Sequence, residues 1–161
     1  MRAVVQRVHW ARVRVADRVV GEIDRGVLVL LGIHRDDSLE IASWIAHKIA
    51  GLRIFPNEHG RFDRSVADVR GSVLVVSQFT LYGDARRGFR PSFSDAAPPD
   101  KAEPLYEHVV NQLRTRHALH TEMGIFGADM EVESCNWGPV TIIIEKESGF
   151  PHVEESRTSS S

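Results

Sequence analysis

Residues 77–80, SQFT, place hydroxyl and amide side chains at the end of an apolar segment. The run GSVLVVSQF predicts a buried strand over residues 71–79. Strand ends release backbone N–H groups, and α/β folds bind ligands there. Ser77 or Thr80 could act as a nucleophile only beside a base, and the next histidine along the chain is His108. The alternative is a strand that simply ends in solvent.

A glycine–proline pair, Gly138 and Pro139, stands directly before the β-branched run VTIII at residues 140–144. This run predicts a buried strand, and proline cannot donate a hydrogen bond to a strand ladder. Gly138 has no side chain, so another chain or a ligand could approach its backbone closely. Because most X–Pro bonds in folded proteins are trans, the pair taken alone predicts a trans turn.

Three arginines, Arg86, Arg87 and Arg90, lie in a loop that also carries Phe89 and Phe93. Guanidinium groups bind phosphate, and aromatic rings stack on nucleic-acid bases. The loop could therefore contact RNA, or it could be an ordinary solvated loop. The formal net charge of −2 indicates that any RNA contact is local.

Familiar patterns for other chemistries are absent from the sequence, among them G-x-S-x-G, H-E-x-x-H, the P-loop and G-x-G-x-x-G. The eight histidines lack metal-ligand spacing, so we predict no metal and no cofactor. Cys135 is the only cysteine, which excludes an intramolecular disulfide and favours a reducing compartment. Without a signal-peptide pattern or a membrane-length apolar run, we expect a cytoplasmic protein that does not bind membranes.

The elements that must position these candidates can be predicted from hydrophobic periodicity. Strands are expected over residues 2–8, 11–15, 19–23, 27–33, 71–79, 129–135 and 140–145. One helix is expected after residue 38, and a second follows the arginine loop, with Ala102, Leu105, Val109 and Leu113 facing inward. We predict one mixed α/β domain over residues 1–147, with a barrel-like sheet and two main helices. A polar, disordered tail is expected over residues 148–161.

Four motifs in order, SQFTLY, RRGFRPSF, GIFGADM and NWGPVT, give the chain a resemblance to the D-aminoacyl-tRNA deacylases, the D-tyrosyl-tRNA deacylase family. The similarity runs from the N-terminal VVQRV to about Glu145. It implies an editing esterase that hydrolyses D-aminoacyl-tRNA, and glycine mischarged on tRNA-Ala, to free amino acid and tRNA. It also implies a homodimer and a partner in the acceptor end of tRNA.

In the family the glycine–proline bond is cis, and the pair enters the active site of the partner subunit. The resemblance therefore implies that Gly138 and Pro139 form a chiral gate, which holds the α-amino group and rejects L-residues by collision with the proline. Arg7 matches a family arginine that orients this pair.

The same resemblance assigns the catalytic half of the site to residues 77–80. The backbone N–H groups of Phe79 and Thr80 would stabilise the oxyanion, while Ser77 and Gln78 would shape the pocket. The 2′-hydroxyl of the terminal adenosine would assist, without metal. Phe126 and Met130 match residues near the adenosine pocket.

Trp137 departs from the family pattern, because many relatives carry a small or polar residue before the Gly-Pro pair. Three alternatives stay open. A related deacylase branch holds the pair trans and acts on L-alanyl-tRNA. A non-catalytic RNA-binding module would use the arginine loop alone, and a conventional serine or threonine hydrolase would need Thr80 for turnover.

Overall fold

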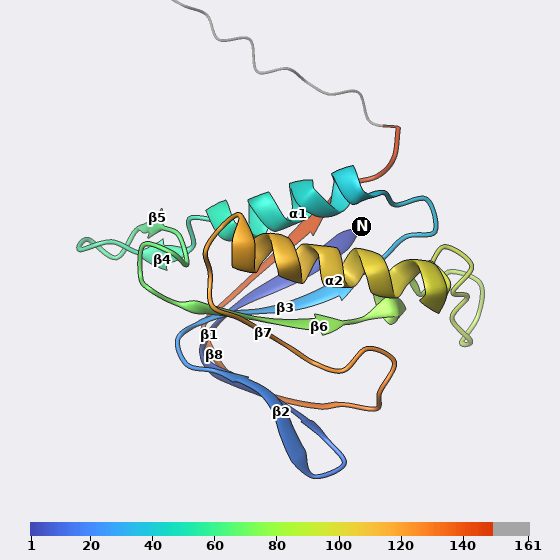
Figure 1. The fold of residues 1–161 in the computed structure, drawn as a ribbon, viewed down its shortest axis with the longest axis horizontal. Coiled ribbons are helices and arrows are strands. Elements are labelled where there is room, and N and C mark those ends of the chain that lie inside the picture. The colour runs from blue at the N-terminus through green and yellow to red at the C-terminus, as the bar shows by residue number, and fades with distance from the viewer. Residues whose placement is uncertain (150–161) are drawn as a thin grey trace, which may run out of the picture.

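The computed structural model describes residues 1–149 (Figure 1). The expected tail lies almost wholly outside these residues. The larger elements are β1 (Arg2–Val15), β2 (Arg18–Ile23), β3 (Gly26–Gly32), α1 (Leu39–Gly51), β6 (Ser72–Ser77), α2 (Pro99–Thr115) and β8 (Glu131–Glu145). The shorter ones are β4 (Phe55–Pro56), β5 (Phe62–Arg64), the 3₁₀-helix η1 (Phe79–Tyr82) and β7 (Thr121–Met123).

The main sheet is mixed and has the strand order β2-β1-β3-β6-β7, with β8 paired to the other side of β1. β3, β6 and β7 run parallel to one another, and β1 pairs antiparallel with β2, β3 and β8. One side of β1 holds β3 along its first half and β2 along its second half, so the sheet curls. The predicted mixed α/β fold with a barrel-like sheet and two helices is confirmed.

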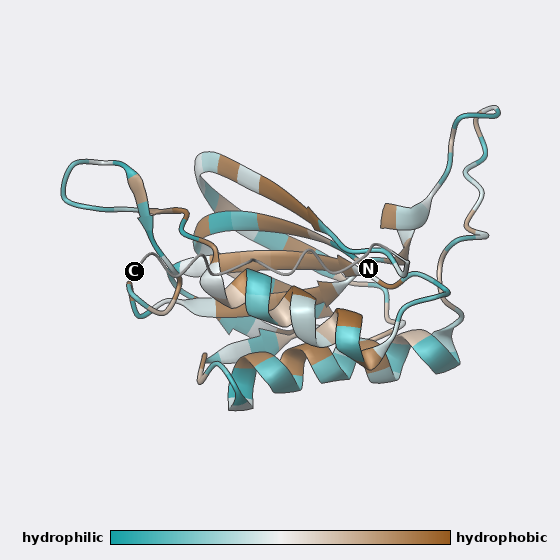
Figure 2. Ribbon diagram, turned by 90° about the horizontal axis from the view of Figure 1, so that it is seen from above, coloured by the Kyte–Doolittle hydropathy of each residue, from teal (hydrophilic) through white to brown (hydrophobic). Residues whose placement is uncertain are grey.

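Both helices cover the same face of the sheet (Figure 1). α1 begins where the Ser38 hydroxyl accepts a hydrogen bond from the Ile41 N–H at 3.3 Å, as the sequence predicted for this segment. The larger hydrophobic core lies between the helices and the sheet, and a smaller cluster fills the inside of the curl. Figure 2 shows the apolar strips of both helices and of the strands.

The local structure differs from the predictions at several points. The two strands expected over residues 2–8 and 11–15 form one strand, β1. The strand expected over residues 71–79 ends at Ser77, and the chain turns into η1 at Phe79. The two strands expected over residues 129–135 and 140–145 form one strand, β8, that is interrupted by an irregularity. The short strands β4, β5 and β7 were not predicted, because each has only two or three residues.

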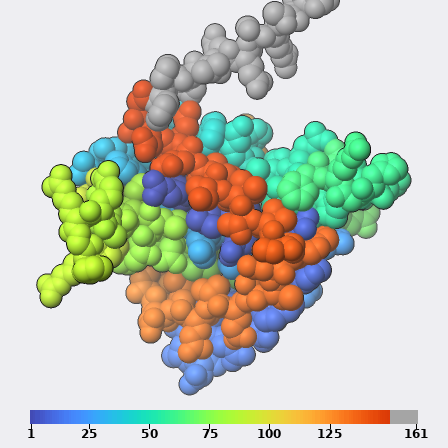
Figure 3. Space-filling model, turned by 180° about the vertical axis from the view of Figure 1, so that it is seen from behind, coloured from blue at the N-terminus to red at the C-terminus, as the bar shows by residue number. Residues whose placement is uncertain are grey.

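The run at residues 140–144 is not in a buried strand. β8 pairs only with β1 among the described residues, so its other edge is unpaired, and Ile143 is 66% exposed. Figure 3 shows β8, in orange and red, crossing an open face between the loop that contains the three arginines and the β4–β5 hairpin. A β-branched run fits a central strand and an edge strand equally well, which explains the error. A long, exposed edge strand is a surface on which a further strand can pair.

No helix within residues 1–149 is long and apolar enough to cross a membrane.

Candidate active site

The segment at residues 77–80 lies where β6 leaves the sheet. Ser77 is the last residue of β6 and pairs with Leu31 of β3, and the Gln78 N–H donates to the Leu31 carbonyl at 2.8 Å. η1 starts at the next residue, and the first N–H groups of a helix have no acceptor within it. The backbone N–H groups of Phe79 and Thr80 therefore lie at a strand end, beside the exposed Phe79 side chain. The Gln78 side-chain amide donates to the Thr80 hydroxyl.

An apolar cavity of about 390 Å³ adjoins this strand end. It is lined by Phe79, Phe93, Ala96, Ala97, Pro98, Pro99, Ala102, Phe126 and Gly127. The rings of Phe79 and Phe93 meet edge to face at 5.1 Å, and Phe126 lies 5.8 Å from the buried Tyr106. None of the lining residues titrates, so the cavity offers apolar and aromatic surface but no acid or base. A flat aromatic group would fit such a surface.

The structure brings Phe126, but not Met130, to this cavity. Met130 packs against the smaller core cluster, where its sulfur would lie 2.6 Å from a Cβ built on Gly124. Its assignment to the adenosine pocket stays a prediction. Phe93 was singled out from the sequence only as a ring of the arginine loop, and the other lining residues at 96–102 were missed as parts of a site. The prolines of SDAAPP were the available signal for the start of α2, since proline favours the first helical position.

Arg7 fixes the backbone at the base of the glycine–proline pair. Its Nε donates to the Trp137 carbonyl at 3.1 Å, and its Nη1 donates to the Ile54 carbonyl at 2.8 Å. Only 6% of Arg7 is exposed, and burial lowers its pKa. None of the ion pairs formed within residues 1–149 involves Arg7. Carbonyl dipoles and aromatic faces, rather than a carboxylate, therefore surround its positive charge.

The Gly138–Pro139 peptide bond is cis, so the trans turn expected from the pair alone was wrong. Both residues are exposed, and Gly138 has a φ of 128°, a conformation that L-residues rarely adopt. A Cβ built on Gly138 would lie 2.8 Å from a Val140 methyl group, 2.9 Å from the Val140 nitrogen and 3.3 Å from Arg7 Nη2. The position therefore accepts only glycine without movement of the backbone.

Within one chain, this pair lies far from residues 77–80. Ser77 pairs with Leu31, which pairs with Ala3, whereas the pair lies opposite Arg7, four residues further along β1. Four residues span about 13 Å along a strand, and the three strand spacings from β8 to β6 add about 14 Å across the sheet. The two motifs are thus roughly 20 Å apart in the same subunit.

The three loop arginines do not form one group. Arg86 makes a two-point ion pair with Asp84 in its own loop, with Nε and Nη2 donating at 2.8 and 2.7 Å. This contact holds the pKa of Asp84 at about 2. Arg87 and Arg90 are exposed and take part in no ion pair within residues 1–149. These two, with the fully exposed Phe89, remain the candidates for an RNA contact.

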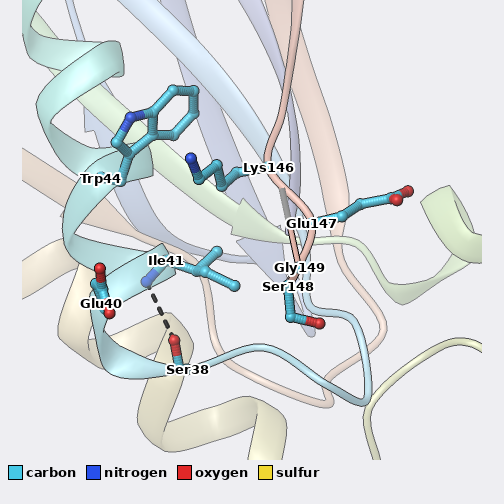
Figure 4. Close-up of a pocket in the computed structure, with 8 residues that line it drawn as sticks. All are labelled: Ser38, Glu40, Ile41, Trp44, Lys146, Glu147, Ser148 and Gly149. Atoms are coloured by element: carbon cyan, nitrogen blue, oxygen red, sulfur yellow. Dashed lines mark hydrogen bonds between the residues drawn. The ribbon is translucent and has the colours of Figure 1, made fainter. Parts of the chain in front are cut away.

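A second cavity, of about 220 Å³, lies between the start of α1 and residues 146–149 (Figure 4). Trp44 borders it and has the ammonium groups of Lys48 and Lys146 at 5.3 and 5.0 Å from its ring. No residue predicted for the site lines this cavity. The part of the chain that the structure describes contains no group of three or more His, Cys, Asp or Glu residues that could hold a metal ion.

Comparison with known proteins gives consistent matches over nearly the whole chain. The family model for D-Tyr-tRNA(Tyr) deacylase matches residues 4–145. A D-aminoacyl-tRNA deacylase of Thermotoga petrophila is 54% identical over 150 residues, which is 93% of this chain and 100% of the relative. The D-aminoacyl-tRNA deacylase of Anaeromyxobacter dehalogenans is 55% identical with the same coverage.

Two solved structures have the same fold. A c-Myc DNA unwinding element binding protein superimposes with a TM-score of 0.85 and 41% identity, over 92% of this chain and 100% of that one. A probable eukaryotic D-amino acid tRNA deacylase superimposes with a TM-score of 0.76 over 89% of this chain and 97% of that one, but at 17% identity it shows the fold alone. From these matches and the motifs already located in the structure, the chain belongs to the D-Tyr-tRNA(Tyr) deacylase family.

Proposed function

We propose that the protein is an editing esterase that hydrolyses D-aminoacyl-tRNA to the free D-amino acid and tRNA. Family membership and the names of the relatives support this activity. The observation that carries it is an apolar cavity beside the start of η1, where the first backbone N–H groups of the helix, at residues 79 and 80, have no acceptor within the helix. Aminoacyl-tRNA is present where translation takes place, so we propose that the enzyme acts in the cytoplasm.

The terminal adenine would occupy the cavity, against Phe79, Phe93 and Phe126. This placement brings the ester carbonyl to the strand end, where the N–H groups of Phe79 and Thr80 would stabilise the oxyanion. A single oxyanion donor is worth about 3–4 kcal/mol of barrier lowering. Ser77 and Gln78 would shape the floor of the site.

Water would attack the carbonyl carbon, and the C–O bond to the ribose would break. The water proton would pass to the leaving ribose oxygen. Because no lining residue of the cavity titrates, the 2′-hydroxyl of the terminal adenosine, next to the ester oxygen, would relay this proton. An aminoacyl ester is already activated, so such a limited apparatus suffices.

The selection of D-residues would come from a partner subunit. The Gly138–Pro139 pair is roughly 20 Å from residues 77–80 of its own chain, and it lies on the exposed edge strand β8. In a two-fold dimer each contact occurs twice, with the two surfaces exchanged between subunits. A partner subunit that covers the open face beside β8 would bring its own pair to the strand end of the first subunit. Homodimerisation is thus a requirement of the proposal.

The pair would hold the α-amino group while the strand end holds the carbonyl. With these two groups and the α-carbon fixed, the hand of the residue decides where its side chain points. A D side chain would point to solvent, and an L side chain would strike Pro139, which is discrimination by exclusion. Glycine has no side chain to collide, so glycine on tRNA-Ala would also be hydrolysed. The acceptor stem would contact Arg87 and Arg90.

The test compares D-tyrosyl-tRNA, L-tyrosyl-tRNA, glycyl-tRNA-Ala and L-alanyl-tRNA as substrates, with buffer alone as the control for spontaneous hydrolysis. We expect release of amino acid from the first and third substrates, without added metal. Hydrolysis of L-tyrosyl-tRNA at a comparable rate would contradict the proposed selection. Preferential hydrolysis of L-alanyl-tRNA would instead support the L-alanine-specific branch.

A further inference from the structure

The pairing of β1 with β8 contains two irregularities beside the glycine–proline pair. Gln6 pairs with Thr141 and Val8 with Asn136, so one residue of β1, Arg7, faces the four residues 137–140 of β8. Three extra residues therefore bulge out of β8 at this point. On the other side, Val8 pairs with Asn136 and Trp10 with Cys135, which leaves His9 as an extra residue in β1.

Side-chain contacts must hold the bulge, because residues 137–140 have no ladder partner on β1. The Trp137 ring makes three such contacts. It stacks on His9 with centroids 4.9 Å apart and an interplanar angle of 19°, and the Arg7 guanidinium carbon lies 4.2 Å from the ring centroid. The ring also meets the fully buried Phe55 at 6.0 Å, which ties it to the main core.

Arg7 connects this ring to the backbone of the pair. The same guanidinium that lies over the Trp137 ring donates to the Trp137 carbonyl, the last acceptor before Gly138. Its Nη2 would also lie 3.3 Å from a Cβ built on Gly138, so the guanidinium fills the space beside that residue. A shift of the indole would therefore release Arg7 and, through it, Gly138.

We propose that Trp137 is a positioning residue for the Gly138–Pro139 pair, held in place by its stack on His9. The bulky ring holds the base of the bulge through aromatic and cation–π contacts, and one of these contacts reaches the core. This inference rests on the proposed function, since the exact position of the Gly138–Pro139 pair affects activity only if the pair selects the hand of the substrate. It gives a role to Trp137, which the sequence alone left without one.

The test measures kcat/KM for D-tyrosyl-tRNA and L-tyrosyl-tRNA with the full-length protein and four variants. Trp137→Ala removes the indole, Trp137→Phe keeps an aromatic ring, and His9→Ala removes the stacking partner. His9 is exposed, so its variant folds even if Trp137→Ala does not. Trp44→Ala is the matched control, because Trp44 is half-buried and in contact with two lysines but lies on α1, away from the pair.

We expect Trp137→Ala to lower the ratio of D to L activity at least about tenfold, a change of roughly 1.4 kcal/mol. We expect His9→Ala to lower it about threefold and Trp137→Phe to restore most of it, with KM for tRNA unchanged. Wild-type ratios in His9→Ala and in any folded Trp137→Ala would overturn the proposal, as would an equal loss in Trp44→Ala. A wild-type enzyme without discrimination would instead refute the proposed function, before any variant is compared.

Tryptophan fluorescence gives a readout that does not depend on activity. Removing the stacked imidazole by His9→Ala should increase the emission of the wild-type protein but not that of Trp137→Phe. No difference between the two backgrounds would contradict the stack on which the proposal stands.

Discussion

Gly138→Ala places one methyl group at the point where the structure has least room for it. The new Cβ would lie 2.9 Å from the backbone nitrogen of Val140 and 2.8 Å from a Val140 methyl group. The methyl group can rotate away, but the backbone nitrogen cannot. The φ of 128° is in addition unfavourable for any L-residue. Either the protein keeps this backbone at a cost in stability, or the Gly138–Pro139 pair moves.

The magnitude follows from these two terms. A sparsely populated backbone conformation costs about 1–3 kcal/mol, and an overpacked contact about 1–3 kcal/mol more. If the pair stays in place, the free energy of unfolding should fall by roughly 2–6 kcal/mol. If the pair moves, stability is retained, but the ratio of D to L activity should fall by tenfold or more. Gly60→Ala is the matched control, since its φ is 73° and its Cβ would meet nothing within 4 Å.

Urea denaturation and hydrolysis of D- and L-tyrosyl-tRNA are measured on the same samples. Gly60→Ala should lose only about 1–2 kcal/mol and keep the wild-type D to L ratio. A Gly138→Ala protein with both wild-type stability and the wild-type ratio would refute the reasoning, because no third way to accommodate the methyl group exists in this geometry.

Asp37→Asn should lower the free energy of unfolding by about 3 kcal/mol in urea, because the Asp37 carboxylate makes a buried ion pair with the Met1 amine at 2.7 Å; unchanged stability would contradict this pair's role. Burial raises the pKa of both tyrosines above the ordinary value of 10.0, so the unfolded chain loses these protons first and stability should fall as the pH rises above that value. Each tyrosine contributes up to about 1.4 kcal/mol per pH unit, so Tyr106→Phe should halve the summed alkaline slope, and an unaltered slope would argue against the assignment. Arg87→Ala and Arg90→Ala should each reduce the salt dependence of tRNA binding by about one phosphate contact, whereas unchanged slopes would exclude the loop from the RNA contact.

Hydrophobic periodicity was sufficient for the overall fold, because both helices and the long strands carry regular apolar spacing. It predicted the buried strand that carries Ser77 but extended it two residues too far, to Phe79, because polar residues within SQFT do not by themselves fix where a strand ends. It could not distinguish a central strand from an edge strand in β8. The same β-branched residues suit either position, and the deciding fact is whether another strand lies alongside.

The candidate site was only partly accessible from the sequence. Its cavity is built from three segments that are brought together by α2 and by the loop that contains Phe126, and no local pattern reports that convergence. Arg86 differs from Arg87 and Arg90 because the Asp84 carboxylate, two residues earlier, accepts two hydrogen bonds from its guanidinium. The bulge opposite Arg7 follows from the register of two strands, which single-strand patterns do not contain.

The most direct test of the central claim uses mixed dimers. One subunit carries Ala96→Trp, which fills the cavity but leaves the Gly138–Pro139 pair intact, and the other carries Pro139→Ala with the cavity intact. Two different C-terminal tags allow the mixed dimers to be purified. If the pair of one subunit acts on the cavity of the other, each mixed dimer has one complete site and should show about half of the wild-type D-tyrosyl-tRNA hydrolysis. Activity no higher than the average of the two parent homodimers would contradict the account.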